Sequence, residues 1–169
     1  MLKHLLVPLD GSERSETALP IARDVLGSEG TLTLLNVIDL PETSLLMLYD
    51  MPPVLAAWDN TKNVLPDAQK NARMYLRQVA EKMHLPPTVV VHIEVCVGNT
   101  ASIIAERAQA LHVDAIVMST HGRSGLSRWM FGSVTQRVMG LMPCPVLVVP
   151  GQSSLSNPLT PAETAKTAS

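Results

Sequence analysis

Short apolar runs rich in β-branched residues recur along this chain, separated by stretches with helical periodicity. The apolar runs occupy residues 5–10, 31–39, 88–97, 115–119 and 145–149. Runs of this length and composition are typical of strands that are buried on both faces of a parallel sheet. Because neighbouring parallel strands need a crossover connection, strands that alternate with helices indicate βαβ units. The pattern therefore predicts an α/β fold, an open five-stranded parallel sheet with helices on both faces.

Composition limits the classes of partner. Aromatic residues make up 3% of the chain against 46% hydrophobic residues, so the core must consist of aliphatic side chains and methionine. The formal net charge of −2 supplies no general attraction to nucleic acid or anionic lipid. The first ten residues hold only short apolar runs broken by Lys3, His4 and Pro8, which fits neither a signal peptide nor a membrane span. We expect a cytoplasmic protein that binds neither nucleic acid nor membrane.

Capping residues and prolines place the expected helices. Ser12 is a candidate N-cap for the first helix, and Pro20 should kink that helix or delay its start. The second helix is expected from about Pro66, and the third after a cap at Asn99 or Thr100. A fourth helix is expected to begin near Ser133 and to stop before residues 143–145.

Two cysteines, Cys96 and Cys144, lie within apolar segments with no CxxC or metal-ligand spacing around them. We interpret them as small hydrophobic residues of the core.

Two segments stand apart from the alternating pattern. Residues 41–63 form an unusually long and apolar connection, which we interpret as a short helix folded onto the core; a lid or a partner-binding surface is the alternative. Residues 151–169 are rich in Ser, Thr, Ala and Pro and lack periodicity. They predict a flexible C-terminal tail.

The most unusual residues follow the first and fourth expected strands, at residues 8–12 and 119–133. In open parallel sheets, ligands bind beyond the carboxyl ends of the strands, where the strand order reverses. Glycines at 122, 125 and 132 allow close backbone approach, and Gly132-Ser133 stands at an expected helix start, which suits an anion such as phosphate. Turn formation and close packing are the alternative explanation for such glycines. Arg123 and Arg128 could add positive charge.

Residues 5–19, LLVPLDGSERSETAL, and residues 119–150, which begin STHGRSGLSRWMFGS, closely resemble the universal stress protein family. The resemblance extends over residues 1–150 and implies a universal stress protein domain there. ATP-binding members share Gly, two residues, Gly, nine residues, then Gly followed by Ser or Thr. Gly122 and the pair Gly132-Ser133 match this pattern, whereas Ser119 stands in place of the first glycine.

The resemblance implies a Rossmann-like fold, similar to the adenine nucleotide alpha hydrolases, that binds ATP or another adenine nucleotide between the first and fourth strands. Pro8, Leu9 and Asp10 would contact the adenosine, and Val37 the adenine. The remaining implied contacts, mostly to ribose and phosphates, are Met118, Ser119, Gly122, Arg123, Gly125, Gly132, Ser133 and Val134. Asp10 also has a direct physical case, because a carboxylate at a strand end accepts hydrogen bonds from sugar hydroxyls or an amino group. A turn and helix cap at Asp10-Gly11-Ser12 is the alternative.

Binding without fast turnover is the favoured function. Residues 119–133 contain no Asp or Glu, and the chain lacks both the P-loop signature and the GxSxG motif. The leading hypothesis is a nucleotide-dependent regulatory protein. The alternatives are a slow ATPase or nucleotide-dependent transferase, and a family member that acts through protein contacts, for which Ser119 is the hint. Mg²⁺ could accompany the phosphates, although no metal-ligand set is evident.

The resemblance further implies a homodimer formed through the last strand, residues 145–150. A short apolar edge strand fits this expectation, because its unpaired backbone groups can bond to a symmetric partner. A covered strand is the alternative. We expect a protein partner, where there is one, to bind at residues 41–63.

Overall fold

The computed structural model of the 169-residue chain describes residues 2–39, 61–120, 132–141 and 143–150. The expected helix or lid within 41–63 and the expected tail at 151–169 therefore lie wholly or mainly outside the described residues. The division into a domain at 1–150 and a tail at 151–169 stays a prediction.

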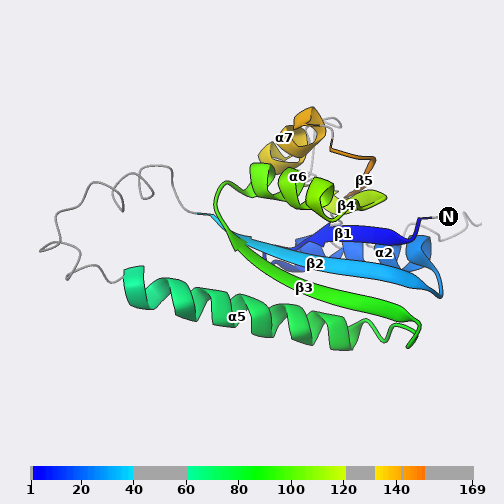
Figure 1. Cartoon of the computed structure of the whole chain (residues 1–169), viewed down its shortest axis with the longest axis horizontal. Helices are drawn as coiled ribbons and strands as arrows, with labels where there is room; N and C mark the ends of the chain where they lie inside the picture. Colours follow the sequence, from blue (N-terminus) through cyan, green and yellow to red (C-terminus); the bar gives the residue numbers. More distant parts are fainter. Residues whose placement is uncertain (1, 40–60, 121–131, 142, 151–169) are drawn as a thin grey trace, which may run out of the picture.

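Five parallel strands form one sheet, as the alternating pattern predicts (Figure 1). The strand order is β3-β2-β1-β4-β5, so β1 and β4 are neighbours although two strands separate them in the chain. β2 and β3 pair along their full lengths, whereas β1 and β4 share a short register, Leu5 with Ala115 and Leu6 with Ile116. The strands span His4–Pro8 (β1), Gly30–Ile38 (β2), Val89–Val97 (β3), Ala115–Thr120 (β4) and Val146–Pro150 (β5).

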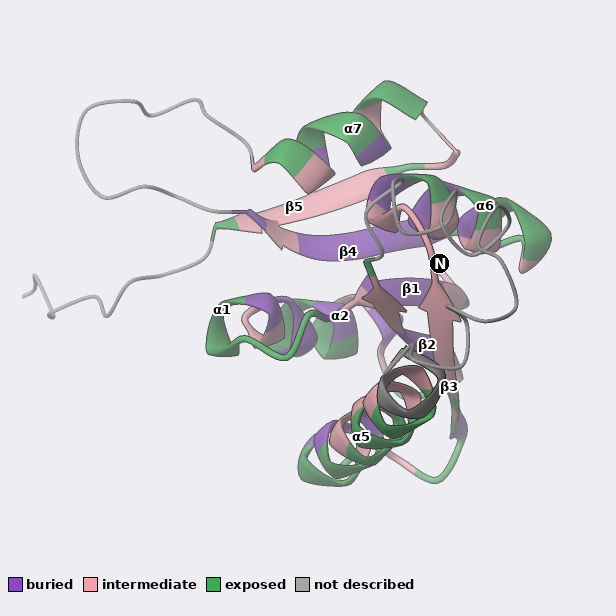
Figure 2. Cartoon of the chain, turned by 90° about the vertical axis from the view of Figure 1, so that its left-hand side faces the viewer, coloured by how far each residue is buried: buried purple, intermediate pink, exposed green. Residues whose placement is uncertain are grey.

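Helices cover both faces of this sheet (Figure 2). One face carries α2 and α5, and the opposite face carries α6 and α7. The helices span Glu13–Glu16 (α1), Ala18–Leu26 (α2), Thr61–Lys82 (α5), Thr100–Ala110 (α6) and Ser133–Leu141 (α7). None of the helices in the described ranges is both long and apolar enough to cross a membrane.

The expected caps are confirmed. The Ser12 side chain accepts a hydrogen bond from the backbone N–H of Ser15, and the Asn99 side chain accepts one from Ser102. The effect of Pro20 is also visible, because the helical segment after Ser12 is divided at Thr17 into α1 and α2. Proline has no N–H and cannot donate to the carbonyl four residues earlier, so Pro20 is accommodated in the first turn of a new helix.

The expected start of the second long helix is wrong. α5 begins at Thr61, and Pro66 lies inside it. The expectation rested on the preference of proline for the first helical turn. A proline inside a helix removes one backbone hydrogen bond and costs about 3 kcal/mol, which burial of the helix elsewhere can offset. Here Leu76 and Val79 of α5 are almost fully buried against the sheet.

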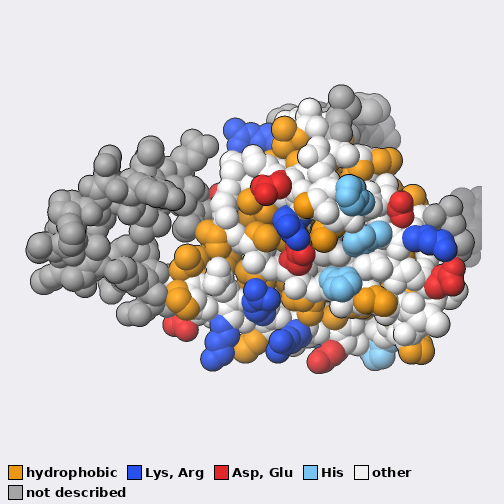
Figure 3. Space-filling view, viewed as in Figure 1, with side chains coloured by type: hydrophobic (Ala, Val, Ile, Leu, Met, Phe, Trp, Pro, Cys, Tyr) orange, Lys and Arg blue, Asp and Glu red, His pale blue; other side chains and the backbone are white. Residues whose placement is uncertain are grey.

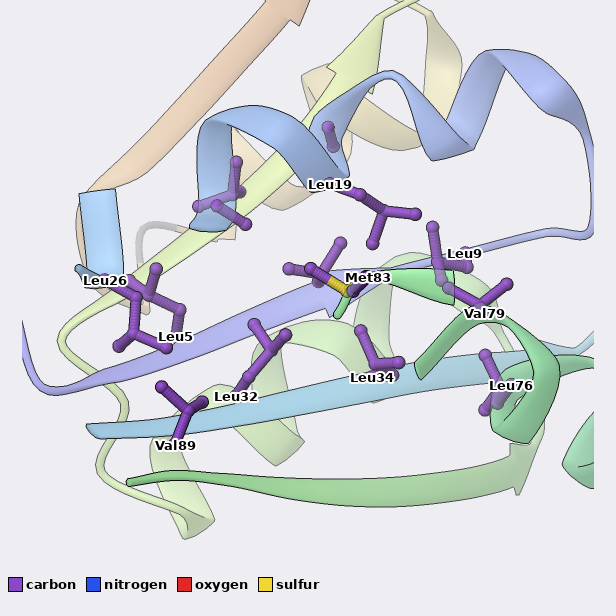
Figure 4. Packing of buried hydrophobic residues seen from close by; sticks show 14 of the residues in the cluster. Leu5, Leu9, Leu19, Leu26, Leu32, Leu34, Leu76, Val79, Met83 and Val89 are labelled. Carbon is purple, nitrogen blue, oxygen red and sulfur yellow. The ribbon is translucent and has the colours of Figure 1, made fainter. Parts of the chain in front are cut away.

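The core consists of aliphatic side chains, in agreement with the composition. Figure 4 shows the larger cluster, in which α2 contributes Leu19 and Leu26 and α5 contributes Leu76 and Val79. These helix side chains pack against buried side chains on one face of the sheet. A second cluster joins α6 and α7 to the other face, and Cys96 and Cys144 pack at its margin. Both cysteines are half-buried, and burial raises the pKa of each thiol.

Candidate functional site

A cleft lies beyond the carboxyl ends of the strands, where β1 and β4 meet. The chain leaves β1 toward α1 and α2 on one face of the sheet, and the helix after β4, α7, covers the other face. Because these connections diverge to opposite faces, a crevice opens between them. The sequence predicted a ligand site at this edge of the sheet.

The cleft has a volume of about 270 Å³ and is lined by both apolar and polar residues. All the predicted site residues that fall among the described residues line it: Pro8, Leu9, Asp10, Val37, Met118, Ser119, Gly132, Ser133 and Val134. Gly122, Arg123 and Gly125, as well as Arg128, lie outside the described residues. The cleft therefore gathers residues from segments that are more than a hundred positions apart in the sequence.

Asp10 is held by the turn that follows β1. Its Oδ1 atom accepts hydrogen bonds from the backbone N–H of Ser12 at 2.9 Å and from the Ser12 hydroxyl at 2.6 Å. Burial raises the pKa of Asp10, but the hydrogen bonds from Ser12 outweigh burial, so the net pKa is lower than usual. Asp10 is therefore ionised at neutral pH. Both hydrogen bonds from Ser12 reach Oδ1, so Oδ2 keeps lone pairs that can accept from a ligand.

The turn and cap roles considered for Asp10-Gly11-Ser12 are both present. Ser12 caps α1, and Gly11 adopts a φ of +86°, which favours glycine. Asp10 also lines the cleft. The two explanations are compatible, because Asp10 uses one carboxylate oxygen for the turn.

The opposite wall is the N-terminus of α7. The backbone N–H of Gly132 donates to Thr120 Oγ1 at 3.2 Å, which fastens the helix start to the end of β4. The first helical bond then runs from the N–H of Gln136 to the carbonyl of Gly132 at 2.9 Å. The N–H groups of residues 133–135 precede the regular hydrogen bonding of the helix and can bind an anion.

The third wall comes from β2 and α6. Leu35, Val37 and Asp39 alternate along the strand end and share one face, and all three line the cleft. Thr100 and Ile104, from the first turns of α6, also line the cleft. Val37 is paired with Cys96 of β3, which fixes its place in the sheet.

Several lining residues were missed by the sequence analysis: Ser15, Leu35, Asp39, Thr100, Ile104 and Thr135. Period-two alternation from Val37 could have identified Leu35 and Asp39, since both lie two residues away. Ser15 and Thr135 follow helix starts, where the sequence offers only a capping pattern. Thr120 also escaped notice, although its hydroxyl holds Gly132.

The polar groups of the cleft are segregated by charge. Carboxylates of Asp10 and Asp39 follow β1 and β2, whereas the electropositive N-terminus of α7 follows β4. Such an arrangement suits a ligand with hydrogen-bond donors at one end and an anion at the other. Within the described ranges, no group of three or more His, Cys, Asp or Glu side chains is placed to hold a metal ion.

Comparisons with known proteins agree with the fold. The model of the universal stress protein family matches residues 1–150. The universal stress protein MJ0531 of Methanocaldococcus jannaschii is 30% identical, with 88% of this chain and 82% of that protein covered.

Two solved structures illustrate the similarity. The structure of MJ0577, from the same organism, superposes with a TM-score of 0.65 at 29% identity and covers 91% of this chain and 99% of that one. A universal stress protein family protein from Arabidopsis thaliana with AMP bound has a TM-score of 0.56 at 12% identity, with 89% and 93% covered, which supports the fold alone. The resemblance expected from the sequence is thus confirmed, and the chain belongs to the universal stress protein family.

Proposed function

We propose that this protein binds ATP, or another adenine nucleotide, in the cleft between β1 and β4 and acts as a nucleotide-dependent regulatory or stress-response protein with little or slow hydrolysis. The observation that carries the proposal is the segregation of charge across the cleft, with Asp10 on one wall and the α7 N-terminus on the other. Adenosine carries hydroxyl and amino donors, and its phosphates carry the negative charge. The AMP bound to the Arabidopsis relative adds support.

In this proposal Pro8, Leu9 and Asp10 contact the adenosine, and Val37 lies against the adenine. Gly132, Ser133 and Val134 meet the phosphates and ribose together with Met118 and Ser119. The predicted contacts of Gly122, Arg123 and Gly125 belong to the same proposal. Mg²⁺ could accompany the phosphates, because phosphate oxygens suit this ion.

The experiment is isothermal titration of nucleotide-stripped protein with ATP and magnesium. We expect saturable binding that is lost in Gly132→Val, because the added side chain would obstruct phosphate approach to the α7 N-terminus. Gly140→Val is the matched control: Gly140 lies in the last turn of the same helix, and a Cβ there would meet nothing within 4 Å. Absence of binding in the wild-type protein would contradict the proposal and favour a member that acts through protein contacts.

Slow ATP hydrolysis is a second candidate function. Asp10 and Asp39 are carboxylates in the cleft, although residues 119–133 contain none. Phosphate release that exceeds the background and is abolished in Asp10→Asn would establish an ATPase. Release that is unchanged by this substitution would point to contamination.

A homodimer through β5 belongs to the same proposal. β5 is an edge strand whose residues are half-buried or exposed, and its position supports pairing with a symmetric partner. A cytoplasmic location is likewise part of the proposal, and cell fractionation would test it.

A further inference from the structure

A row of cations lies on the outer surface of α5, and none of these residues lines the β1–β4 cleft. Lys70, Arg73 and Arg77 are all exposed. They follow one another at three- and four-residue steps, so they lie on one face of the helix. Figure 3 shows Lys and Arg side chains gathered along the lower part of the molecule, where Figure 1 places α5.

These cations border a groove. Together with Pro66, Gln69 and Met74 they line a shallow depression of about 410 Å³ on the helix surface. Met74 is 47% exposed, which is unusual for a large apolar side chain. The groove thus offers positive charge and an apolar contact within the same small area.

Among the described residues, no carboxylate forms an ion pair with this row. Three ion pairs occur among the described residues, at Lys3–Glu29, Arg23–Asp24 and Arg107–Glu94, and none includes a cation of the α5 row. Asp67 lies three residues before Lys70 and Glu81 lies four residues after Arg77, so these carboxylates reduce the positive charge at the two ends of the row, although neither lies within 4.0 Å of its cations. Arg77 lies seven residues after Lys70, a rise of about 10 Å along the helix. This is close to the Debye length of about 10 Å at 0.1 M salt, so the cations act jointly on one ligand.

We propose that this basic groove on α5, formed by Lys70, Arg73 and Arg77 around Met74, docks an acidic segment of a partner protein. The charge of the groove requires an anionic partner, and exposed Met74 favours one that also carries an apolar side chain. A membrane surface fits less well, because the apolar residues of α5, Leu76 and Val79, are buried against the sheet and cannot enter a bilayer. Nucleic acid fits less well, because a phosphate backbone would leave the exposed Met74 without an apolar contact.

Fluorescence anisotropy of the full-length protein tests this inference, with a labelled peptide that alternates glutamate with leucine as the probe. We expect saturable binding that weakens steeply as salt is raised. The double variant Arg73→Glu/Arg77→Glu should bind the probe at least about tenfold more weakly, since two attractions become repulsions. The matched control is Lys3→Glu/Arg137→Glu, which makes the same change in net charge at exposed positions away from α5.

Three outcomes would overturn the proposal. They are absence of saturable peptide binding, an equal loss in the control variant, and tighter binding of phosphatidylserine vesicles or duplex DNA than of the peptide. Circular dichroism and ATP titration of both variants show whether the fold and the cleft are intact. A wild-type protein that binds the peptide but not ATP would contradict the nucleotide proposal alone, so the two proposals can fail separately.

Discussion

At the scale of single residues, Thr120 connects the end of β4 to the start of α7. Its hydroxyl accepts the hydrogen bond of the Gly132 N–H. Thr120→Val keeps the side-chain shape and leaves this N–H without its partner. A neutral hydrogen bond contributes about 1 kcal/mol, so we expect ATP affinity to fall by about fivefold as the phosphate-binding amides lose their alignment.

Titration calorimetry measures this change. Thr120→Ser retains the hydroxyl and should restore most of the affinity. If the valine and serine variants bind ATP equally, the hydrogen bond has no role in holding the site.

His4 makes folding stability depend on pH. Burial and the nearby His92 lower the pKa of His4 below 6.5, and this outweighs the opposing effects of Asp114, Glu94 and the Leu111 backbone. The Nε2 atom of His4 also lies 2.9 Å from Thr33 Oγ1. Because the unfolded chain binds the proton more readily than the folded chain, stability is complete above about pH 6.5 and is lost as the pH falls through the folded-state pKa.

Urea unfolding at a series of pH values tests this dependence. His4→Gln should flatten the loss of stability between about pH 7 and 5, whereas His84→Gln, at an exposed position, should leave it in place. Equal slopes in wild type and His4→Gln would contradict the assignment. The carboxyls of Asp10 and Asp114 also have lowered pKa values, below 3.8, so their contributions disappear only in stronger acid.

At the scale of elements, β2 can begin where it does only because residue 30 is glycine. Gly30 has a φ of +134°, and a Cβ at this position would lie 2.6 Å from the Lys3 carbonyl oxygen and 2.8 Å from Leu26. Gly11 also has a positive φ, but a Cβ there would meet nothing within 4 Å. We expect Gly30→Ala to lower the free energy of unfolding by about 3 kcal/mol, through strain and overlap together.

Gly11→Ala is the matched comparison and should cost about 1 kcal/mol, from backbone strain alone. Urea unfolding of the two variants measures the difference. Similar losses in both would show that the contact with Lys3 relaxes easily.

The elements themselves were largely predictable from the sequence, and their limits less so. All five strands were identified because each leaves an apolar run in the sequence, including the half-buried edge strands β3 and β5. The start of α5 was misplaced because proline is common in the first turn of a helix, and the sequence alone does not show that the helix extends back to Thr61 across Pro66. Within the cleft, residues adjacent to recognisable motifs were predicted. Asp39 and Thr100 were not predicted, because neither belongs to such a motif. They reach the cleft through their places after β2 and at the start of α6.

At the scale of the whole molecule, β5 forms one edge of the sheet. The N–H of Ile116 in β4 donates to the carbonyl of Pro145 at 2.9 Å. Because backbone groups alternate in direction along a strand, those of residues 147 and 149 also point toward β4. Those of Val146 and Val148 therefore point outward. In the proposed dimer these groups pair with the partner, and Val148→Pro should remove one donor and produce a folded monomer.

Sedimentation at micromolar concentration tests this expectation. The wild type and Val148→Thr, which keeps the backbone N–H, should sediment as dimers. A wild-type monomer would contradict the dimer, and a dimeric Val148→Pro variant would place its interface elsewhere. Thermal unfolding monitors whether the proline variant remains folded.

The hydrogen bond between Thr120 and Gly132 has an implication for protein engineering. It brings together the two ends of the segment 121–131, so that segment begins and finishes at a fixed point on the scaffold. Closing a loop of twice the length costs only about 0.6 kcal/mol more. Segments of different length or composition could consequently be grafted between these two residues while the sheet stays the same. The part of ligand recognition that depends on residues 121–131 would then be exchangeable independently of the rest of the cleft.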